Sequence, residues 1–579
     1  MYELGKTYVL LGAVSCLIGV VLCFVGRGRL IFSWLALLLL PPMAFVIIWN
    51  WYFSLVINPI YAFFSANRLA PSVALTYGYQ LYYPADRGPV NGWIYPPVGA
   101  LAYLPATAVS NPPMTVLAGC CLSLLFYFGP VTGLLAFEAR RGRLKAEVAC
   151  LLFTAFAVLS NRLISLYMVS TMAHTDAPAL GFGALALGLV GRIRGERLGT
   201  IGVGAIVAAI CASYSKQVQA PLLLMPALWV TATGGIWPGL RSLGITAALV
   251  LSVLVPVALV FGPEEFFFNT WIVPSHHGLK YPTIGENATL LFWSLWTQLQ
   301  RPLFAILLCT LASVAVVRVR GIDRWGALRD DPIWLSFLIG GCLEIPPAIL
   351  GYVKRGGDFN GEAYALYPLA IALILILGRC VWSVPRLAAL LIVLTLYLGV
   401  SESRGMMREL PRFDRAPSGG TSPRARWMAE QRLVLRYLRE HPGEAYFPYN
   451  ILDHLAVEKR LYHYESGVDF QAIAGYPLGL EHLREFTPPR TRIICYPTLV
   501  SELITEPTTP GYLGDFTTPV SVPDLPGFTC FARSTVEGPV STERDAVGKI
   551  PSGRTPGSGR EVPARRSEAT TPAAGATAR

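Results

Sequence analysis

Charged residues are scarce in this sequence, because Asp, Glu, Lys and Arg together make up only 14% of its 579 residues. Soluble domains carry roughly 25%. Hydrophobic residues reach 53%, and the mean hydropathy is +0.48. This composition excludes a water-soluble fold for most of the chain, and we expect an integral membrane protein.

Several chemical motifs are missing as well. The sequence has no Gly-rich phosphate-binding loop, no dinucleotide fingerprint, no G-x-S-x-G elbow and no H-E-x-x-H helix. Nucleotide-driven transport within this chain is therefore not expected. The 11 cysteines lack metal-ligand spacing and lie mostly in apolar runs. Cys495 and Cys530 lie in a polar region instead, and they can form a disulfide if that region is extracytoplasmic.

Long apolar runs dominate the first two thirds of the chain. A membrane-spanning helix needs about 20 such residues, which predicts about twelve spans here. Residues 8–25 lack the basic start and the cleavage site of a signal peptide, so residues 1–29 are predicted to be an N-terminal anchor helix. The other runs are 31–56, 115–137, 147–161, 176–191, 199–214, 219–234, 242–262, 303–318, 332–352, 362–378 and 383–400.

Basic clusters set the predicted orientation. The net charge of +11 is concentrated in short clusters and in the tail, a pattern that favours the inner membrane face over nucleic acid. With these clusters inside, the loops 58–97 and 263–300 face outward, and residues 30–401 form the transmembrane domain. The clusters are Arg27 with Arg29, 140–145, 192–197, 318–329, and Arg379 with Arg386.

The composition changes after residue 401. Residues 425–440 have helical periodicity, and the composition predicts a small extracytoplasmic mixed α/β domain over 402–535. The tail, 536–579, is rich in Pro, Gly, Ser, Thr, Ala and Arg and is predicted to be disordered. The fold class is thus an α-helical polytopic membrane protein with a C-terminal α/β domain. Segments typical of strands are 445–449, 460–466, 492–497 and 528–533.

The outer loop 58–97 is long, aromatic and rich in Pro and Gly. Irregular loops of this length tend to be functional or disordered, and the aromatic content argues against disorder. We interpret the loop as the front wall of an active site on the outer membrane surface. An interfacial aromatic belt is the alternative. Its only carboxylate is Asp86, beside Arg87, and its aromatic candidates are Tyr79, Tyr82, Tyr83, Trp93 and Tyr95.

Ionisable residues mark predicted outer helix ends. His174 and Asp176 precede Pro178, and ionisable groups at a membrane edge suggest function. Helix capping by Thr175 or Asp176 is the alternative, and the two roles are compatible. Lys216 lies at another outer helix end, either as a snorkelling lysine or as a contact to a lipid-linked phosphate.

The outward turn 354–361 is crowded with polar residues. Positive charge on an outer face runs against the usual bias, so Lys354 and Arg355 are predicted to bind a phosphate or pyrophosphate, with Asn360 beside them. A solvated loop is the alternative. The adjacent His276 and His277 favour a surface loop over a metal site. No metal site is predicted, although a divalent cation between His174 and Asp176 stays open.

The order of these features resembles the GT-C superfamily of polytopic glycosyltransferases. The resemblance is to the branch that contains protein mannosyltransferases (glycosyltransferase family 39) and lipid A aminoarabinose transferases. It covers roughly residues 30–400, and its specificity lies in the order and shared outward face of short motifs. These are G-x-x-L-Y at 78–82, Y-P-P at 95–97, H-T-D-A-P at 174–178, Lys216, and K-x-G-G-x-x-N at 354–360.

The resemblance implies a polyprenyl-phosphate sugar as donor and chemistry outside the membrane, near the first loop. Members usually carry an acidic residue where this chain has Asn58, so Asp176 or Asp86 is expected to take the role of catalytic base. The aromatic candidates would form a platform for the sugar. The remaining substrate-binding candidates are His174, Lys216, Lys354, Arg355 and Asn360.

The sequence thus predicts a glycosyltransferase of the cell membrane whose active site and C-terminal domain are extracytoplasmic. Its partners would be the bilayer, a lipid-linked sugar and an acceptor that is a lipid, a protein or a glycan. A lipid-linked sugar flippase and a catalytically silent scaffold are the alternatives. A flippase predicts inverted repeats and charges near the bilayer midplane. The sequence shows no such repeat, and its ionisable residues lie at outer helix ends, which favours transfer chemistry.

Overall fold

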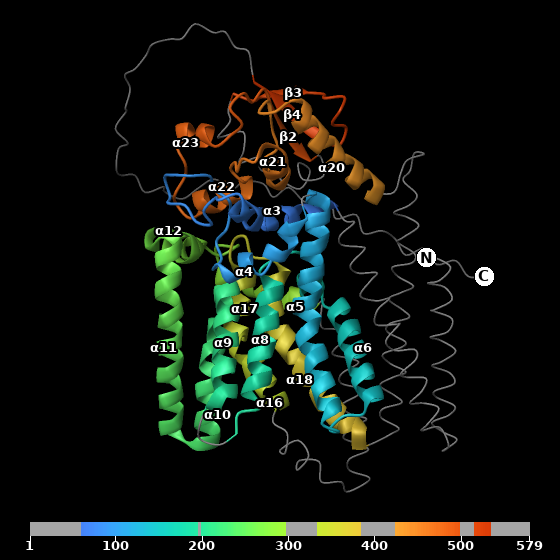
Figure 1. The fold of residues 1–579 in the computed structure, drawn as a ribbon, viewed down its shortest axis with the longest axis vertical. Coiled ribbons are helices and arrows are strands. Elements are labelled where there is room, and N and C mark those ends of the chain that lie inside the picture. Colours follow the sequence, from blue (N-terminus) through green and yellow to red (C-terminus); the bar gives the residue numbers. More distant parts are fainter. Residues whose placement is uncertain are drawn as a thin grey trace, which may run out of the picture. The chain divides into compact units, whose positions relative to one another are not determined.

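The computed structural model describes residues 59–109, 111–194, 198–296, 333–383, 423–497 and 515–533 (Figure 1). Several sequence predictions lie outside these residues. They are the anchor helix 1–29, Asn58, the runs 31–56, 303–318 and 383–400, and the tail 536–579.

Four helical segments of the described residues are long and apolar enough to cross a membrane, by length and composition. A fifth is possible if the bent pair α6 (Ala146–Arg162) and α7 (Ile164–Thr171) forms one span. Two shorter apolar helices are α8 (Asp176–Val190) and α9 (Gly199–Ser215). The protein is therefore an integral membrane protein, and the count of about twelve spans stays a prediction. The four segments are α5 (Pro112–Arg140), α11 (Ile236–Phe261), α16 with α17 (Ile333–Leu343 and Ile345–Val353), and η4 with α18 (Phe359–Glu362 and Ala363–Ser383).

Shorter helices connect these segments. The chain leaves α9 through the 3-10 helix η2 (Gln217–Leu224) into α10 (Met225–Gly234). After α11, the outer loop 263–300 begins with three short helical pieces, so it is not irregular there. They are α12 (Pro263–Phe267), the π-helix η3 (Phe268–Ile272) and α13 (Val273–His276).

The first outer loop begins as a helix, α3 (Pro59–Thr76), which continues into coil and then α4 (Val98–Leu101) and the 3-10 helix η1 (Leu104–Ala108). The prediction of an irregular loop over 58–97 is therefore wrong for its first half. Leu69, Ala70 and Val73 recur at helical spacing and pack in a core shared with α5 and the C-terminal region. That apolar stripe, hidden among aromatic residues, explains the helix.

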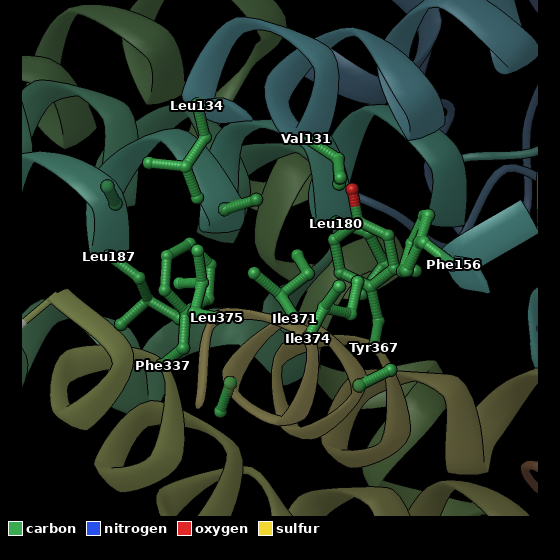
Figure 2. Close-up of a cluster of buried hydrophobic side chains, with 14 of the residues drawn as sticks. Val131, Leu134, Phe156, Leu180, Leu187, Phe337, Tyr367, Ile371, Ile374 and Leu375 are labelled. Carbon is green, nitrogen blue, oxygen red and sulfur yellow. The ribbon is translucent and has the colours of Figure 1, made fainter. Parts of the chain in front are cut away.

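The core of the helical part surrounds α8 (Figure 2). Lipid tails are as apolar as the side chains, so helices in a membrane associate through close packing of small residues. A Cβ at Gly181 of α8 would lie 2.5 Å from the carbonyl oxygen of Phe126 in α5, so the glycine permits this close approach. Gly340 of α16 likewise accommodates Leu187. This tight packing holds α8 firmly and fixes the position of its first residue, Asp176.

The C-terminal described residues form a mixed α/β region. Its four-stranded sheet has the order β1-β2-β4-β3, with β1 and β2 parallel and the other pairs antiparallel. Cys495 and Cys530 are opposite each other on β2 and β4 and form the disulfide that the sequence allowed. The elements are α20 (Pro423–Glu440), β1 (Ala445–Tyr446), α21 (Ile451–Glu458), α22 (Glu465–Ile473), α23 (Leu480–Glu485), β2 (Ile493–Pro497), β3 (Thr518–Val520) and β4 (Phe528–Ala532).

One predicted strand of this region is wrong. Residues 460–466 are not a strand, because α22 begins at Glu465 and the preceding coil bonds elsewhere. The Tyr464 N–H donates to the Val90 carbonyl at 2.7 Å, and the His463 N–H donates to the Phe486 carbonyl at 3.1 Å. Its aromatic residues are buried against the first outer loop and α3 instead of in a sheet.

Candidate active site

Asp176 lies at the centre of a buried polar cluster at the start of α8. The chain leaves α7 at Thr171 and turns through His174 into α8, with Pro178 in the first helical turn, where no intrahelical N–H bond is lost. Thr175 occupies the N-cap position, but its side chain makes no capping bond. Asp176 is only 1% exposed. A carboxylate is favoured at this helix end by the macrodipole.

Four side chains from separate parts of the chain donate to the Asp176 carboxylate. A carboxylate offers about four acceptor positions, so this one is saturated. Its oxygens therefore have no position left for a substrate hydroxyl, and the arrangement suits positioning better than proton abstraction. The donors are Lys216 Nζ at 2.6 Å and the Tyr364 hydroxyl on Oδ1, with Asn360 Nδ2 at 2.7 Å and His174 Nδ1 at 2.5 Å on Oδ2.

Lys216 follows the last residue of α9 in an extended conformation, which turns its side chain toward Asp176. Its ammonium lies 5.2 Å from the ring centroids of both Tyr95 and Tyr364. A cation held against two aromatic rings and a carboxylate is strongly retained. The residue is buried, unlike a snorkelling lysine, whose ammonium reaches water.

His174 links Asp176 to the first outer loop. Its Nε2 lies 3.4 Å from the Tyr95 hydroxyl, on the side of the ring opposite Asp176. The pKa of His174 is lowered to about 4, because burial, with smaller effects of Lys216 and Arg68, outweighs the opposing effect of Asp176. The imidazole is therefore neutral at pH 7. With Nδ1–H donated to Asp176, the Nε2 lone pair is oriented to accept a proton.

The turn 354–361 carries Asn360 to the cluster. It folds back on α17, where a Cβ at Gly361 would lie 2.8 Å from the Tyr352 nitrogen, so only glycine fits without a shift. The Asp358 side chain accepts the Phe359 N–H at 2.7 Å and begins η4. Asn360 then donates to Asp176 from the second residue of η4, and Tyr364 follows four residues later on the same face.

Lys354 is a half-buried cation beside this cluster. Its backbone forms a bridge with Leu279, which joins the turn to the segment that follows α13. Burial lowers the pKa of Lys354 to about 8, and Lys216 acts in the same direction. Within the described residues, no hydrogen bond or ion pair is formed by its ammonium. A nearby cation, a low-dielectric setting and no acidic partner together make this lysine a candidate for binding an anion.

The aromatic candidates of the first loop have different positions. The Tyr95 hydroxyl contacts His174 in the cluster. The Trp93 ring packs edge-on against the Tyr95 ring, with 5.6 Å between the two centroids. Tyr82 is buried and donates to the Tyr95 carbonyl at 2.7 Å, which supports the loop from behind. The hydroxyls of Tyr79 and Tyr83 bond elsewhere, to the Lys459 carbonyl and to the Gln80 N–H. Of the five aromatic residues predicted to form the sugar platform, Tyr95 contacts the cluster and Trp93 packs against the Tyr95 ring.

Asp86 and Arg355 lie apart from the cluster in their contacts. Asp86 forms an exposed ion pair with its neighbour Arg87 at 3.5 Å, and both side chains are at least 75% exposed. Arg355 is exposed, and its backbone N–H donates to the Gly278 carbonyl at 2.8 Å. Of the two carboxylates considered for catalysis, the structure brings Asp176 together with other candidates, and those are His174, Lys216, Asn360 and Tyr95.

A divalent cation is a poor fit to the His174–Asp176 pair, because Lys216 and Asn360 already donate to the same carboxylate. Across the described ranges, no group of three His, Cys, Asp or Glu side chains is arranged to hold a metal ion. His276 is exposed, whereas His277 is buried, with Nε2 3.2 Å from the Phe470 carbonyl oxygen.

The α/β region covers the first outer loop. The Val90 N–H donates to His463 Nδ1 at 2.9 Å, and Gln471 donates to the Ala85 carbonyl at 2.7 Å. Tyr464 packs against Gly92, and its buried hydroxyl has no hydrogen-bond partner in the part of the chain that the structure describes. The region therefore clamps the segment that leads into Tyr95.

The chain is similar in structure to ArnT from Cupriavidus metallidurans. The crystal structure of that protein bound to undecaprenyl phosphate is 12% identical, covering 86% of this chain and 98% of that chain at a TM-score of 0.41. Its apo crystal structure is also 12% identical, with 81% and 93% covered at a TM-score of 0.40. No family model and no curated protein sequence matches the chain.

Sequence reasoning missed two members of the site. Tyr364 could have been found, because it follows Asn360 by four residues at the start of an apolar helix and therefore shares its face. Arg68 had no such signal. Its guanidinium lies 5.5 Å from the Tyr95 ring centroid and donates to the Gly92 carbonyl at 3.3 Å, a contact that depends on the unpredicted helix α3.

Proposed function

We propose that this protein is a membrane glycosyltransferase that moves a sugar from a polyprenyl-phosphate donor to an acceptor hydroxyl on the extracytoplasmic face. The observation that carries the proposal is the convergence on Asp176 of an oriented histidine and a buried lysine, next to Lys354, which has no acidic partner among the described residues. Such a site offers a base for a hydroxyl and a cation for a phosphate. The order of motifs that resembles GT-C enzymes supports the same reaction.

The proposed roles follow from the geometry. Asp176 holds His174 in the tautomer whose Nε2 carries a lone pair, as the acid of a catalytic triad does. The acceptor oxygen attacks the anomeric carbon, and its proton passes to His174 Nε2. The bond between that carbon and the phosphate oxygen breaks, and the phosphate leaves with the electron pair. Lys354 would neutralise the departing phosphate.

The location also favours a lipid-linked substrate. The cluster lies at one end of α8 and α9, both apolar helices, and Lys354 directly follows a segment that can span a membrane. An anion that reaches a lysine at this depth is most simply one anchored in the bilayer. The Cys495–Cys530 disulfide supports an oxidising compartment for the α/β region and therefore an extracytoplasmic site.

Release of polyprenyl phosphate by the purified full chain tests the proposal. Polyprenyl-phosphate sugars would be offered with a lipid, a peptide and a glycan acceptor, and products would be counted by mass spectrometry. We expect the wild type to release polyprenyl phosphate, the Asp176→Asn variant to lose this activity, and Asp86→Asn to retain it. Relocation of intact lipid-linked sugar across vesicles without release would instead identify a flippase. Absence of both activities would favour a silent scaffold.

A further inference from the structure

A second polar site lies at the opposite end of α8 from Asp176. A cavity of about 370 Å³ opens there, among the residues that follow α5 and α8, the first turn of α9 and the start of α16. Sixteen residues separate Asp176 from Arg192, and at 1.5 Å per helical residue the two lie about 24 Å apart. The cavity is therefore distinct from the candidate active site. Its charged lining residues are Arg141, Arg143, Arg192 and Arg194.

One buried acid lies beside two of these arginines. Glu138, in the last turns of α5, is buried, with Arg143 at 3.6 Å and Arg192 at 3.9 Å from its oxygens. Arg192 also stacks on Phe137, at 3.9 Å from its guanidinium carbon to the ring centroid. Its Nε is nevertheless buried without a hydrogen-bond acceptor among the described residues, and its Nη2 faces Glu138 Oε1 at 3.9 Å without a hydrogen bond. A guanidinium whose buried donors lack acceptors is costly unless an anion supplies them.

The backbone adds to this preference. Gly199, Thr200 and Ile201 line the cavity with the first turn of α9. The first N–H groups of a helix have no partner within it, and the macrodipole favours an anion there. Leu198 at the N-cap position provides no capping side chain. The donors of the arginines and of this helix end thus line the same space.

The rest of the lining is apolar. Ile193, Leu198 and Ile333 face the cavity, and Ile201 at its edge is 44% exposed. A polar, cationic floor with an apolar rim at a helix end suits a phosphate that carries acyl chains. Basic pockets between membrane helices bind anionic lipid headgroups in the same way.

We propose that this arginine cavity binds a phosphoryl group, supplied by the headgroup of an anionic phospholipid in the leaflet opposite the active site. Arg192 provides the buried fork, Arg141 and Arg194 hold the outer phosphate oxygens, and the first turn of α9 donates from the backbone. A bound headgroup would join α5, α8 and α9 at this end, and would thereby stabilise the helix that carries Asp176. The arginines would otherwise serve only to hold the chain's orientation.

Lipid binding by the full chain tests the proposal. The protein would be placed in nanodiscs of phosphatidylcholine with or without phosphatidylglycerol, and retained lipid would be counted by native mass spectrometry after release. We expect wild type to retain phosphatidylglycerol roughly tenfold or more over the Arg141→Gln/Arg194→Gln double variant. Arg241→Gln, an exposed cation of α11 outside the cavity, is the matched control and should behave as wild type.

A second arm separates the two sources of phosphate. Inorganic phosphate and pyrophosphate would be titrated against the thermal unfolding of the same three proteins in neutral detergent. Stabilisation by these ions that is lost in the double variant, without preference for phosphatidylglycerol, would keep the phosphate site but overturn its lipid source. Equal lipid retention by wild type and double variant, or equal loss in Arg241→Gln, would overturn the site.

A third variant distinguishes a loss of lipid binding from a loss of folding. Arg192→Lys keeps the positive charge near Glu138 but removes the planar fork. We expect it to unfold near the wild-type temperature and to retain less phosphatidylglycerol. If it retains wild-type amounts, Arg192 is not the anion-binding group that we infer.

Discussion

The two ends of α8 differ in how their buried charged groups are paired. At its first residue, one carboxylate receives four donors and is fully satisfied. At its other end, four arginines line one cavity, two of them lie beside the buried Glu138, and Arg192 Nε has no acceptor among the described residues. A buried polar group without a partner costs more than a made hydrogen bond contributes. At the first end, the Asp176 carboxylate therefore positions other side chains. At the second end, we infer that the arginines bind an anion.

This comparison separates residues that position from residues that bind. Asp176 is occupied, so it acts through His174 and Lys216. The lysine without an acidic partner, Lys354, and the incompletely satisfied Arg192 are the groups with capacity for a ligand. Substitutions at the Asp176 end should therefore reduce the rate of sugar transfer most.

Asp176→Asn breaks the satisfied end most severely. We expect transfer to fall by roughly 10³–10⁴, because an amide can hold the wrong His174 tautomer. The folded state should also lose about 3–5 kcal/mol, since the Lys216 ammonium is left buried without a carboxylate. Release of polyprenyl phosphate and thermal unfolding measure the two effects. Glu286→Gln, an exposed acid of the second outer loop, is the control. A loss below tenfold would contradict the organising role of Asp176.

His174→Gln tests the proton acceptor that Asp176 holds. We expect a fall of roughly 10²–10³ in transfer, the range for loss of a general base. In the wild type, kcat/KM should be constant at neutral pH and fall as the pH drops through about 4, where the imidazole becomes protonated. The control is His276→Gln, because His276 is exposed and bonds only locally. A wild-type profile that breaks near pH 6.5 would assign the titration to another group.

Lys354→Gln tests the lysine without an acidic partner. We expect KM for the lipid-linked donor to rise roughly tenfold, because a charge-assisted bond to phosphate is lost. The wild type should show the same loss as the pH rises through about 8, since the ammonium that binds the phosphate then loses its proton. Lys280→Gln, whose ammonium stacks on Tyr352 at 4.3 Å, is the matched lysine. If KM were unchanged in Lys354→Gln and raised in Lys280→Gln, the phosphate would be assigned to Lys280 instead of Lys354.

Tyr364→Phe is the mildest change to the satisfied end. One donor of four is removed while the ring beside Lys216 remains. We expect transfer to fall about fivefold, as for a net loss of about 1 kcal/mol from one hydrogen bond. Kinetics on the purified variant measure this, with Tyr214→Phe, a tyrosine of α9 in a separate apolar cluster, as the control. A fall as large as that of Asp176→Asn would show that Tyr364 is more than one donor among four.

Much of the helical part could be predicted from the sequence. Apolar runs such as 115–137 and 362–378 lie on α5 and α18, because membrane helices satisfy their backbone internally and need only length and hydropathy. The helix 425–440 followed from its periodicity, and it appears as α20. The prediction of a strand at 460–466 was wrong, because its aromatic residues pack against the first loop and not in a sheet. Local propensity does not reveal such a contact.

By itself, the sequence determined that the chain is a membrane protein and that His174, Asp176, Lys216 and Asn360 are polar residues in unusual places. Their types and positions at helix ends are local properties, which a linear pattern displays. Only the tertiary structure decided that these four meet while Asp86 remains in solvent, and that Arg192 lacks acceptors. Convergence and satisfaction depend on how close-packed helices bring distant segments together, and no local pattern encodes that geometry.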